Sequence, residues 1–194
     1  QCREAWAALQ DMTLPPDYAL AENAVIAGMG GSAIGGSLLQ GIIAGECPVP
    51  LIVCRDYDLP AFVDERTLVI ASSYSGNTEE TLSAVRQARE RGARIIALSS
   101  GGELLRLAKE WSAPVYAIPF KGQPRAALGH LLIPLLGIAQ KLGWVSDKNA
   151  DVADAVAVME EWAEEMNPAA PTAKNPAKQI AARLQGRIPF VYGA

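Results

Sequence analysis

Five short apolar runs alternate with helix-like segments up to about residue 120, and this alternation constrains the fold more than any other feature. Apolar runs of this length are typical of buried strands, and apolar residues three or four positions apart are typical of one helix face. Strands that alternate with helices predict a parallel sheet covered by helices on both faces. The sequence therefore predicts an α/β fold, a three-layer α-β-α sandwich with about five parallel strands. The expected strands are 24–29, 51–54, 68–71, 94–98 and 115–118.

Helical periodicity follows the first, third and fourth runs. It is marked by Ile34, Leu38 and Ile42, then by Leu82, Val85 and Ala88, and then by Leu104, Leu105, Ala108 and Trp111. The link after the second run, residues 56–66, is short and contains Pro60, so it is the least regular crossover. Beyond residue 120 the pattern predicts helices at 123–144, 147–166 and 176–184, the last with Asn175 as its cap and Pro176 at its first position.

A hydroxyl-rich loop joins the third run to the helix that follows it. A helix N-terminus offers unpaired N–H groups and a partial positive charge, and hydroxyls add donors that rotate to fit. This combination predicts a site for a phosphate monoester that needs neither lysine nor a metal. The alternative is ordinary helix capping, with Asn77 and Glu80 as a capping box, but a cap requires only one hydroxyl. The hydroxyls are Ser73, Ser75, Thr78 and Thr81.

A glycine-rich loop, residues 28–36, joins the first run to its helix. Glycines let the backbone approach a ligand and point N–H groups at it, so Gly30, Gly31 and Ser32 are candidate phosphate ligands. The alternative is a dinucleotide fingerprint, because the spacing of Gly28, Gly30 and Ala33 fits that motif and Asp56 could hold a ribose. A dinucleotide site does not need the second, hydroxyl-rich loop, so a single small phosphorylated ligand between two loops is the favoured interpretation.

The composition limits the classes of partner and cofactor that the chain is expected to bind. The chain has 194 residues and a net charge of −4, and its sequence pI of about 5.1 argues against a nucleic-acid-binding surface. The longest apolar stretch, 131–142, is interrupted by Pro134 and is too short to span a membrane. The three cysteines show no motif spacing, which is typical of reduced thiols in the cytoplasm. A single histidine argues against a histidine-built zinc site, and we expect no metal or cofactor.

The order and spacing of the two loops resemble the SIS (sugar isomerase) domain family, and more narrowly the bifunctional phosphoglucose/phosphomannose isomerases of archaea and bacteria. The resemblance rests on motifs distributed over most of the chain. They are Gly28-Met29-Gly30-Gly31-Ser32, Ser73-Tyr74-Ser75-Gly76-Asn77-Thr78, Pro124-Arg125-x-Ala127-Leu128-Gly129, Asn175-Pro176-Ala177-Lys178 and Pro189-x-Val191-Tyr192-Gly193.

The resemblance implies a flavodoxin-like SIS fold and a cytoplasmic, metal-independent, usually homodimeric enzyme with two SIS domains. Such an enzyme interconverts glucose 6-phosphate or mannose 6-phosphate with fructose 6-phosphate through an enediolate. By the same resemblance, the phosphate of the hexose is bound by Ser32, Ser73, Ser75 and Thr78. Arg125 would stabilise the enediolate, because a fixed guanidinium aimed at developing negative charge lowers the barrier.

Proton transfer between C1 and C2 also needs a general base and a ring-opening acid–base group, which in the family are a Glu, a His and a Lys of the second domain. His130 lies on an apolar helix and is interpreted as a partly buried structural residue. Glu79 and Glu80 would repel a phosphate and are interpreted as first-turn acids that favour the helix dipole. This chain by itself is therefore expected to bind sugar phosphate weakly without isomerising it.

The expected organisation is an SIS domain at residues 1–145, followed at 146–194 by linker helices and the first strand of a second, truncated SIS domain. The closing run, 188–194, looks like a strand that ends in glycine, and the first residue is Gln, so the chain is expected to be a fragment or a processed product. A non-catalytic sugar-phosphate-binding regulatory module is the alternative within the family, although no basic helix-turn-helix segment accompanies it here. A dinucleotide-binding Rossmann domain remains the alternative outside the family.

Overall fold

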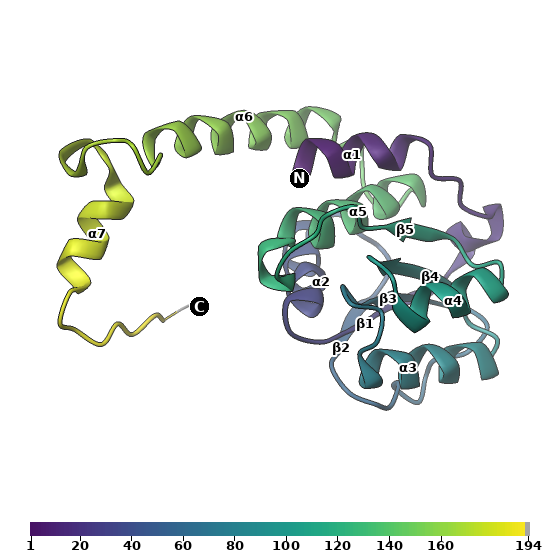
Figure 1. The fold of residues 1–194 in the computed structure, drawn as a ribbon. Coiled ribbons are helices and arrows are strands. Elements are labelled where there is room, and N and C mark those ends of the chain that lie inside the picture. The colour runs from purple at the N-terminus through teal and green to yellow at the C-terminus, as the bar shows by residue number, and fades with distance from the viewer. Residues whose placement is uncertain (193–194) are drawn as a thin grey trace. The chain divides into compact units, whose positions relative to one another are not determined.

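The computed structural model describes residues 1–192 and divides the chain into two compact units, residues 1–148 and 149–194. The first unit contains a five-stranded sheet in the order β2-β1-β3-β4-β5, and every neighbouring pair is parallel (Figure 1). The predicted α/β class and the flavodoxin-like strand order are therefore confirmed. Each predicted strand is within one or two residues of an observed one. The strands are β1 Asn23–Gly28, β2 Leu51–Cys54, β3 Thr67–Ser72, β4 Arg94–Ser99 and β5 Val115–Ala117.

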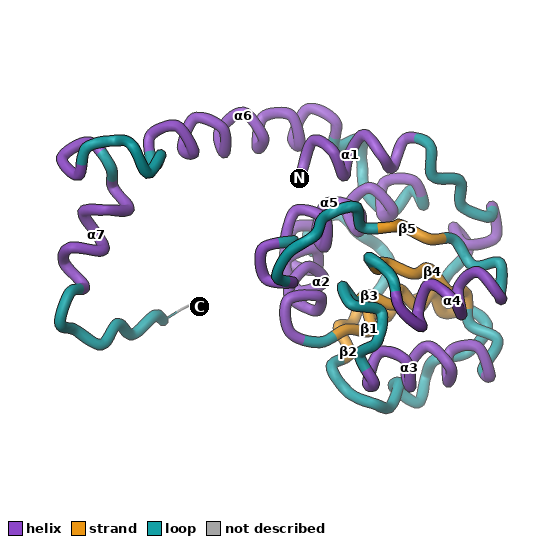
Figure 2. The backbone as a smooth tube through the Cα atoms, in the orientation of Figure 1, coloured by secondary structure: helices purple, strands orange, loops and turns teal. Residues whose placement is uncertain are grey.

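Helices cover both faces of this sheet, as Figure 2 shows for residues 1–148. On one face, α3 and α4 pack over alternate residues of the inner strands, such as Val25, Val69 and Ile95. On the other face, α2 packs over Ile26 and α5 packs against α2, with α1 against α5. The three-layer sandwich is thus observed. Its helices are α1 Cys2–Gln10, α2 Gly30–Ile43, α3 Glu79–Glu90, α4 Gly102–Glu110 and α5 Leu128–Lys141, with short 3₁₀ turns η1 Pro16–Leu20 and η2 Pro124–Ala126.

The α2 periodicity located the helix correctly but not its buried side. The side chains of Ile34, Leu38 and Ile42 are 41 to 52% exposed. The buried face is instead offset by one residue and includes small residues, Ala33 and Gly36 among them. Small residues face inward because α2 lies close to both β1 and α5, and close approach matters more than side-chain size at that face.

The structure differs from the prediction at two helices, one in its extent and one in its existence. The expected helix over 123–144 is shorter, because η2 and a non-helical Ala127 precede α5. The amino-terminal helix α1 was not predicted; Ala5 and Leu9 are its buried residues. None of the helices within residues 1–192 combines the length and the hydropathy that a membrane span requires.

The second unit contains α6 Asn149–Glu165, the 3₁₀ turn η3 Thr172–Lys174 and α7 Pro176–Leu184. The predicted start of the last helix is confirmed, because the Asn175 side chain accepts a hydrogen bond from the Lys178 N–H at 3.0 Å. Residues 188–192 have no strand, although the sequence predicts one there, and Gly193 and Ala194 lie outside the described residues. A strand requires a neighbour for its hydrogen bonds, and this segment pairs with no strand among residues 1–192.

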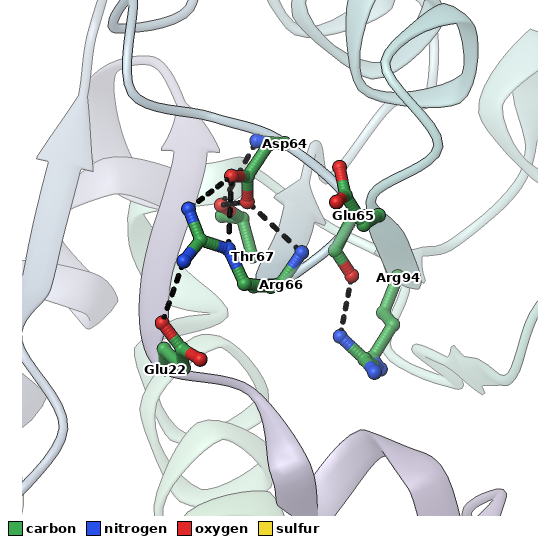
Figure 3. A network of polar contacts seen from close by, with 6 residues as sticks. All are labelled: Glu22, Asp64, Glu65, Arg66, Thr67 and Arg94. Carbon is green, nitrogen blue, oxygen red and sulfur yellow. Dashed lines mark hydrogen bonds and ion pairs between the residues drawn. The ribbon is translucent and has the colours of Figure 1, made fainter.

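A charged network lies at the amino ends of β1, β3 and β4 (Figure 3). The Arg66 guanidinium donates to Asp64 at 2.7 and 3.1 Å and to Glu22 at 3.2 Å. The Arg94 guanidinium donates to the Glu65 carbonyl at 2.6 Å. The network therefore holds the turn before β3 at the amino ends of the strands, opposite to the loops that follow β1 and β3.

Replacing Asp64 with asparagine is expected to remove a pH-dependent part of the stability. Hydrogen bonds from the Arg66 side chain, followed by its backbone N–H, lower the pKa of Asp64 below its usual value. A carboxyl with a lowered folded-state pKa contributes stability above its unfolded pKa of about 3.9, and this stability is lost as the pH falls through the folded value. Urea unfolding from pH 7 to pH 3 should show the gap between wild type and Asp64→Asn closing at the acidic end. Asp11→Asn, at an exposed residue just after α1, is the control, and a gap independent of pH would contradict the assignment.

Candidate functional site

The candidate site lies where β1, β3 and β4 end, at their carboxyl edge. The strand order reverses between β1 and β3, and doubly wound sheets bind ligands at such a point, just outside the strand ends. The glycine loop follows β1, and the hydroxyl-rich loop follows β3. The parallel register places Gly28 beside Ser72, so the two loops leave the sheet side by side.

The glycine loop leads directly into α2 and leaves backbone donors at its start. Met29 is the N-cap, and its carbonyl accepts hydrogen bonds from Ser32 N at 3.0 Å and Ala33 N at 3.2 Å. The N–H groups of Gly30 and Gly31 have no acceptor among the described residues, as is usual for a first helical turn. Gly30 has φ +48°, a left-handed conformation that glycine adopts readily. These two N–H groups and the positive end of α2 suit an anion.

Ser32 joins the two loops. Its hydroxyl oxygen accepts a hydrogen bond from the Tyr74 N–H at 3.1 Å, and its carbonyl accepts one from the Ser72 hydroxyl at 3.4 Å. Ser32 is 6% exposed. Because its oxygen is already an acceptor, the hydroxyl hydrogen remains able to donate to a ligand.

The hydroxyl-rich loop is held by its own side chains. The Ser73 and Thr78 hydroxyls lie 2.8 Å apart, and Ser73 Oγ also accepts from the Gly76 N–H at 3.1 Å. Ser75 is exposed, and its hydroxyl oxygen accepts from the Asn77 N–H at 3.2 Å. Ser73, Ser75 and Thr78 thus lie in one turn before α3, with their hydroxyls ordered by contacts inside the loop.

The capping alternative is wrong in its details. The N-cap of α3 is Thr78, whose side chain makes no capping hydrogen bond. Asn77 does act as a cap, but for the neighbouring helix, since its side-chain oxygen accepts from the Glu103 N–H of α4 at 3.0 Å. The hydroxyls of this loop therefore are not used to cap α3.

Arg125 lies on η2, next to the glycine loop. A Cβ built on Gly31 would lie 3.5 Å from the Pro124 carbonyl oxygen and 3.6 Å from the Arg125 nitrogen. The side chain of Arg125 is exposed, and its guanidinium has no hydrogen bond or ion pair among residues 1–192. The structure thus brings the backbone of the predicted arginine beside the predicted phosphate loop and leaves its charge available.

His130 is enclosed in the interior and is not open to a ligand. It is fully buried on α5, its Nδ1 lies 2.8 Å from the Tyr116 hydroxyl, and its Nε2 lies 3.4 Å from a carboxylate oxygen of Glu4. Burial lowers the pKa of His130, opposed by Glu4, and burial raises the pKa of Tyr116 to about 12. The structural interpretation of this histidine is confirmed, with burial more complete than expected.

A third loop, which lies beside the hydroxyl-rich loop, was not predicted from the sequence. Residues 99–102, Ser-Ser-Gly-Gly, span the junction from the end of β4 to the start of α4, and the Ser100 hydroxyl donates to the Tyr74 carbonyl at 2.6 Å. Serines and glycines directly after an apolar run were the available signal, the same one that marked the other two loops. Asp56, the candidate ribose ligand, instead accepts from the N–H of Tyr57 at 2.7 Å. Among the described residues no cluster of three or more His, Cys, Asp or Glu side chains is placed to hold a metal ion.

Comparison with known proteins shows which families the chain resembles. Residues 56–114 match the SIS domain family. The chain is 48% identical over 172 residues to a bifunctional phosphoglucose/phosphomannose isomerase of Caldicellulosiruptor bescii, covering 89% of this chain and 51% of the relative. A protein of the same name from Thermoplasma acidophilum is 38% identical, with 89% and 50% covered. The chain thus spans about half the length of these curated relatives.

A solved structure shares the fold. A hypothetical protein of Thermus thermophilus superposes with a TM-score of 0.68 at 23% identity, covering 95% of this chain and 45% of that one. Residues 56–114 thus match the SIS domain family, and over most of its length the chain is similar to bifunctional phosphoglucose/phosphomannose isomerases.

Proposed function

We propose that this chain supplies the phosphate-binding half of an aldose–ketose isomerase that interconverts glucose 6-phosphate or mannose 6-phosphate with fructose 6-phosphate. The observation that carries the proposal is the meeting of three segments at the switch point of the sheet. The three segments are the glycine loop with its free N–H groups, the hydroxyl-rich turn before α3, and the 3₁₀ turn that carries Arg125. The names of the similar proteins supply the reaction class, because they are isomerases of these sugar phosphates.

The phosphate would be held by Gly30, Gly31, Ser32, Ser73, Ser75 and Thr78. Helix N-termini and hydroxyls bind a phosphate dianion without a metal, and α2 and α3 both begin at these loops. With the phosphate anchored there, Arg125 would face the carbon atoms that react. Its guanidinium would stabilise the enediolate oxygen as negative charge develops on it.

The remaining catalytic groups are proposed to lie outside this chain. A general base must move a proton between C1 and C2, and ring opening needs a proton donor and acceptor. His130 is enclosed in the interior of the first unit, and Glu79 accepts a hydrogen bond from the Tyr57 hydroxyl at 3.2 Å. A second SIS domain and a homodimeric, cytoplasmic enzyme complete the proposal. Isomerase turnover by this chain alone would contradict it.

Binding of fructose 6-phosphate to the 194-residue chain tests the proposal. Bound ligand raises stability by RT ln(1 + [L]/Kd), so even a weak site shifts the melting temperature at high ligand concentration. The shift with fructose 6-phosphate should exceed that with inorganic phosphate, and NAD should give none. A shift with NAD alone would overturn the proposal in favour of a dinucleotide site.

Ser75→Ala and Arg125→Gln separate the two parts of the site. Each should weaken fructose 6-phosphate binding about tenfold or more, because a hydrogen bond to a charged group contributes roughly 1.5–3 kcal/mol. Ser75→Ala should weaken inorganic phosphate binding to a similar degree, whereas Arg125→Gln should affect the sugar phosphate much more than phosphate. Arg183→Gln, an exposed arginine on α7, is the matched control and should leave both affinities unchanged. Equal effects of the two site variants on both ligands would contradict the assigned roles.

A further inference from the structure

We propose that Tyr74 is a positioning residue whose hydroxyl fixes the segment that carries Arg125 relative to the phosphate loops. The inference rests on the proposed function and gives a role to Tyr74, a motif residue to which none was assigned from the sequence.

The Tyr74 hydroxyl makes two hydrogen bonds to one short stretch of backbone. It donates to the Phe120 carbonyl at 2.8 Å and accepts from the Gly122 N–H at 2.9 Å. Residues 118–123, between β5 and η2, have no helix or strand of their own. One phenol oxygen therefore secures both ends of a three-residue turn that lies just before Arg125.

The backbone of Tyr74 is tied equally closely to the other loops. Its N–H donates to Ser32 Oγ at 3.1 Å, and its carbonyl accepts from the N–H and hydroxyl of Ser100 at 3.0 and 2.6 Å. A single half-buried residue thus connects the glycine loop, the hydroxyl-rich loop, the loop after β4 and the segment before η2.

A hexose phosphate needs the phosphate site and Arg125 to be held at a fixed separation, and the hydrogen bonds of Tyr74 can provide this. The phosphate and the reacting carbons lie at opposite ends of the ligand, so the two sites must be held at a fixed separation. An arginine on an untethered segment would lose conformational freedom on binding, and this loss would be subtracted from the affinity. The aromatic ring of Tyr74 is a rigid spacer with only two rotatable side-chain bonds, and it spans from the hydroxyl-rich loop to the segment before Arg125.

Tyr74→Phe removes the hydroxyl and keeps the ring. Its matched control is Tyr18→Phe, since the Tyr18 hydroxyl also donates to a backbone carbonyl, that of Ile95 at 3.2 Å, at the opposite end of β4 from these loops. In the free protein, Tyr74→Phe should speed hydrogen exchange at the Gly122 amide about tenfold, because its acceptor is lost. Tyr18→Phe should leave that amide unchanged. Unchanged exchange in Tyr74→Phe would overturn the inference whether or not any sugar phosphate binds.

Binding provides the second readout. Calorimetric titration of Tyr74→Phe should show fructose 6-phosphate affinity lowered about tenfold, with inorganic phosphate affinity within about twofold of wild type. In an Arg125→Gln background the same change should have little further effect, because the two residues act as a unit. The inference would be overturned if the affinity losses of Tyr74→Phe and Arg125→Gln were additive in the double variant. It would also be overturned if Tyr74→Phe lowered the affinities for fructose 6-phosphate and for phosphate equally, because Tyr74 would then have only a structural role.

The two proposals fail differently. If wild type shows no preference for fructose 6-phosphate over phosphate, the proposed function is wrong. Faster exchange at the Gly122 amide in Tyr74→Phe would then show only that the Tyr74 hydroxyl stabilises the backbone of that segment, and the positioning role would be wrong as well. If wild type shows the preference but Tyr74→Phe retains it fully, the proposed function stands and the role of Tyr74 is wrong.

Discussion

Gly76→Ala is expected to lower the free energy of unfolding of the first unit by about 2–5 kcal/mol. Gly76 has φ +72°, where an L side chain is strained. A Cβ at this position would lie 1.8 Å from the Gly101 carbonyl oxygen and 2.8 Å from Ser99 Oγ. The first of these atoms is backbone, so the loops after β3 and β4 would have to separate. The separation would also move Ser73 and Ser75, so binding of inorganic phosphate should be lost with the stability.

Urea unfolding and phosphate titration of the same sample measure both effects. Gly101→Ala is the matched control, because it changes the other partner of the contact at a position where a Cβ would meet open space. That variant should unfold within about 0.5 kcal/mol of wild type. A Gly76→Ala protein with wild-type stability and phosphate affinity would show that the two loops are not in the contact described.

Gly35→Ala is expected to destabilise the first unit by about 1–3 kcal/mol, through the contact between α2 and α5. A Cβ on Gly35 would lie 2.3 Å from the Leu131 carbonyl oxygen and 2.8 Å from the Leu131 carbonyl carbon. Both atoms are backbone, so the two helices would have to move apart, and Ser32 and Gly31 at the start of α2 would move with them. Alanine favours a helix over glycine by roughly 1 kcal/mol, and the steric cost must exceed this gain.

Gly41→Ala measures the effect of alanine's higher helix propensity on stability without a steric clash. Gly41 lies in the last turn of the same helix, is exposed, and has nothing within 4 Å of a built Cβ. Its replacement should stabilise the protein by up to about 1 kcal/mol. Opposite signs for the two variants in urea unfolding are the expected result. Stabilisation by both would mean that α2 and α5 pack less closely than the structure indicates.

Local physics made much of this protein predictable from its sequence. The strands were found because runs such as 68–71 must be buried on both faces of a parallel sheet, which leaves a continuous apolar signal. The start of α7 was found because Asn175 and Pro176 suit the cap and first position of a helix by their own chemistry. The candidate loops were found for the same reason, since hydroxyls and glycines after a strand indicate a free helix N-terminus wherever the strand lies.

Contacts between distant segments decided the rest. The inward face of α2 depends on how near α5 lies, so Ile34, Leu38 and Ile42 are exposed while Ala33 and two glycines are buried. Asn77 caps α4 instead of α3 because the two loops meet across β3 and β4. The tie from the Tyr74 hydroxyl to residues 120 and 122 joins positions more than 40 residues apart, a separation at which no periodicity or motif spacing carries information. The sequence by itself determined most of the elements and the kind of loop between them, because those follow from nearby residues. Only the packed sheet decided which loops meet and which side chains lie between them.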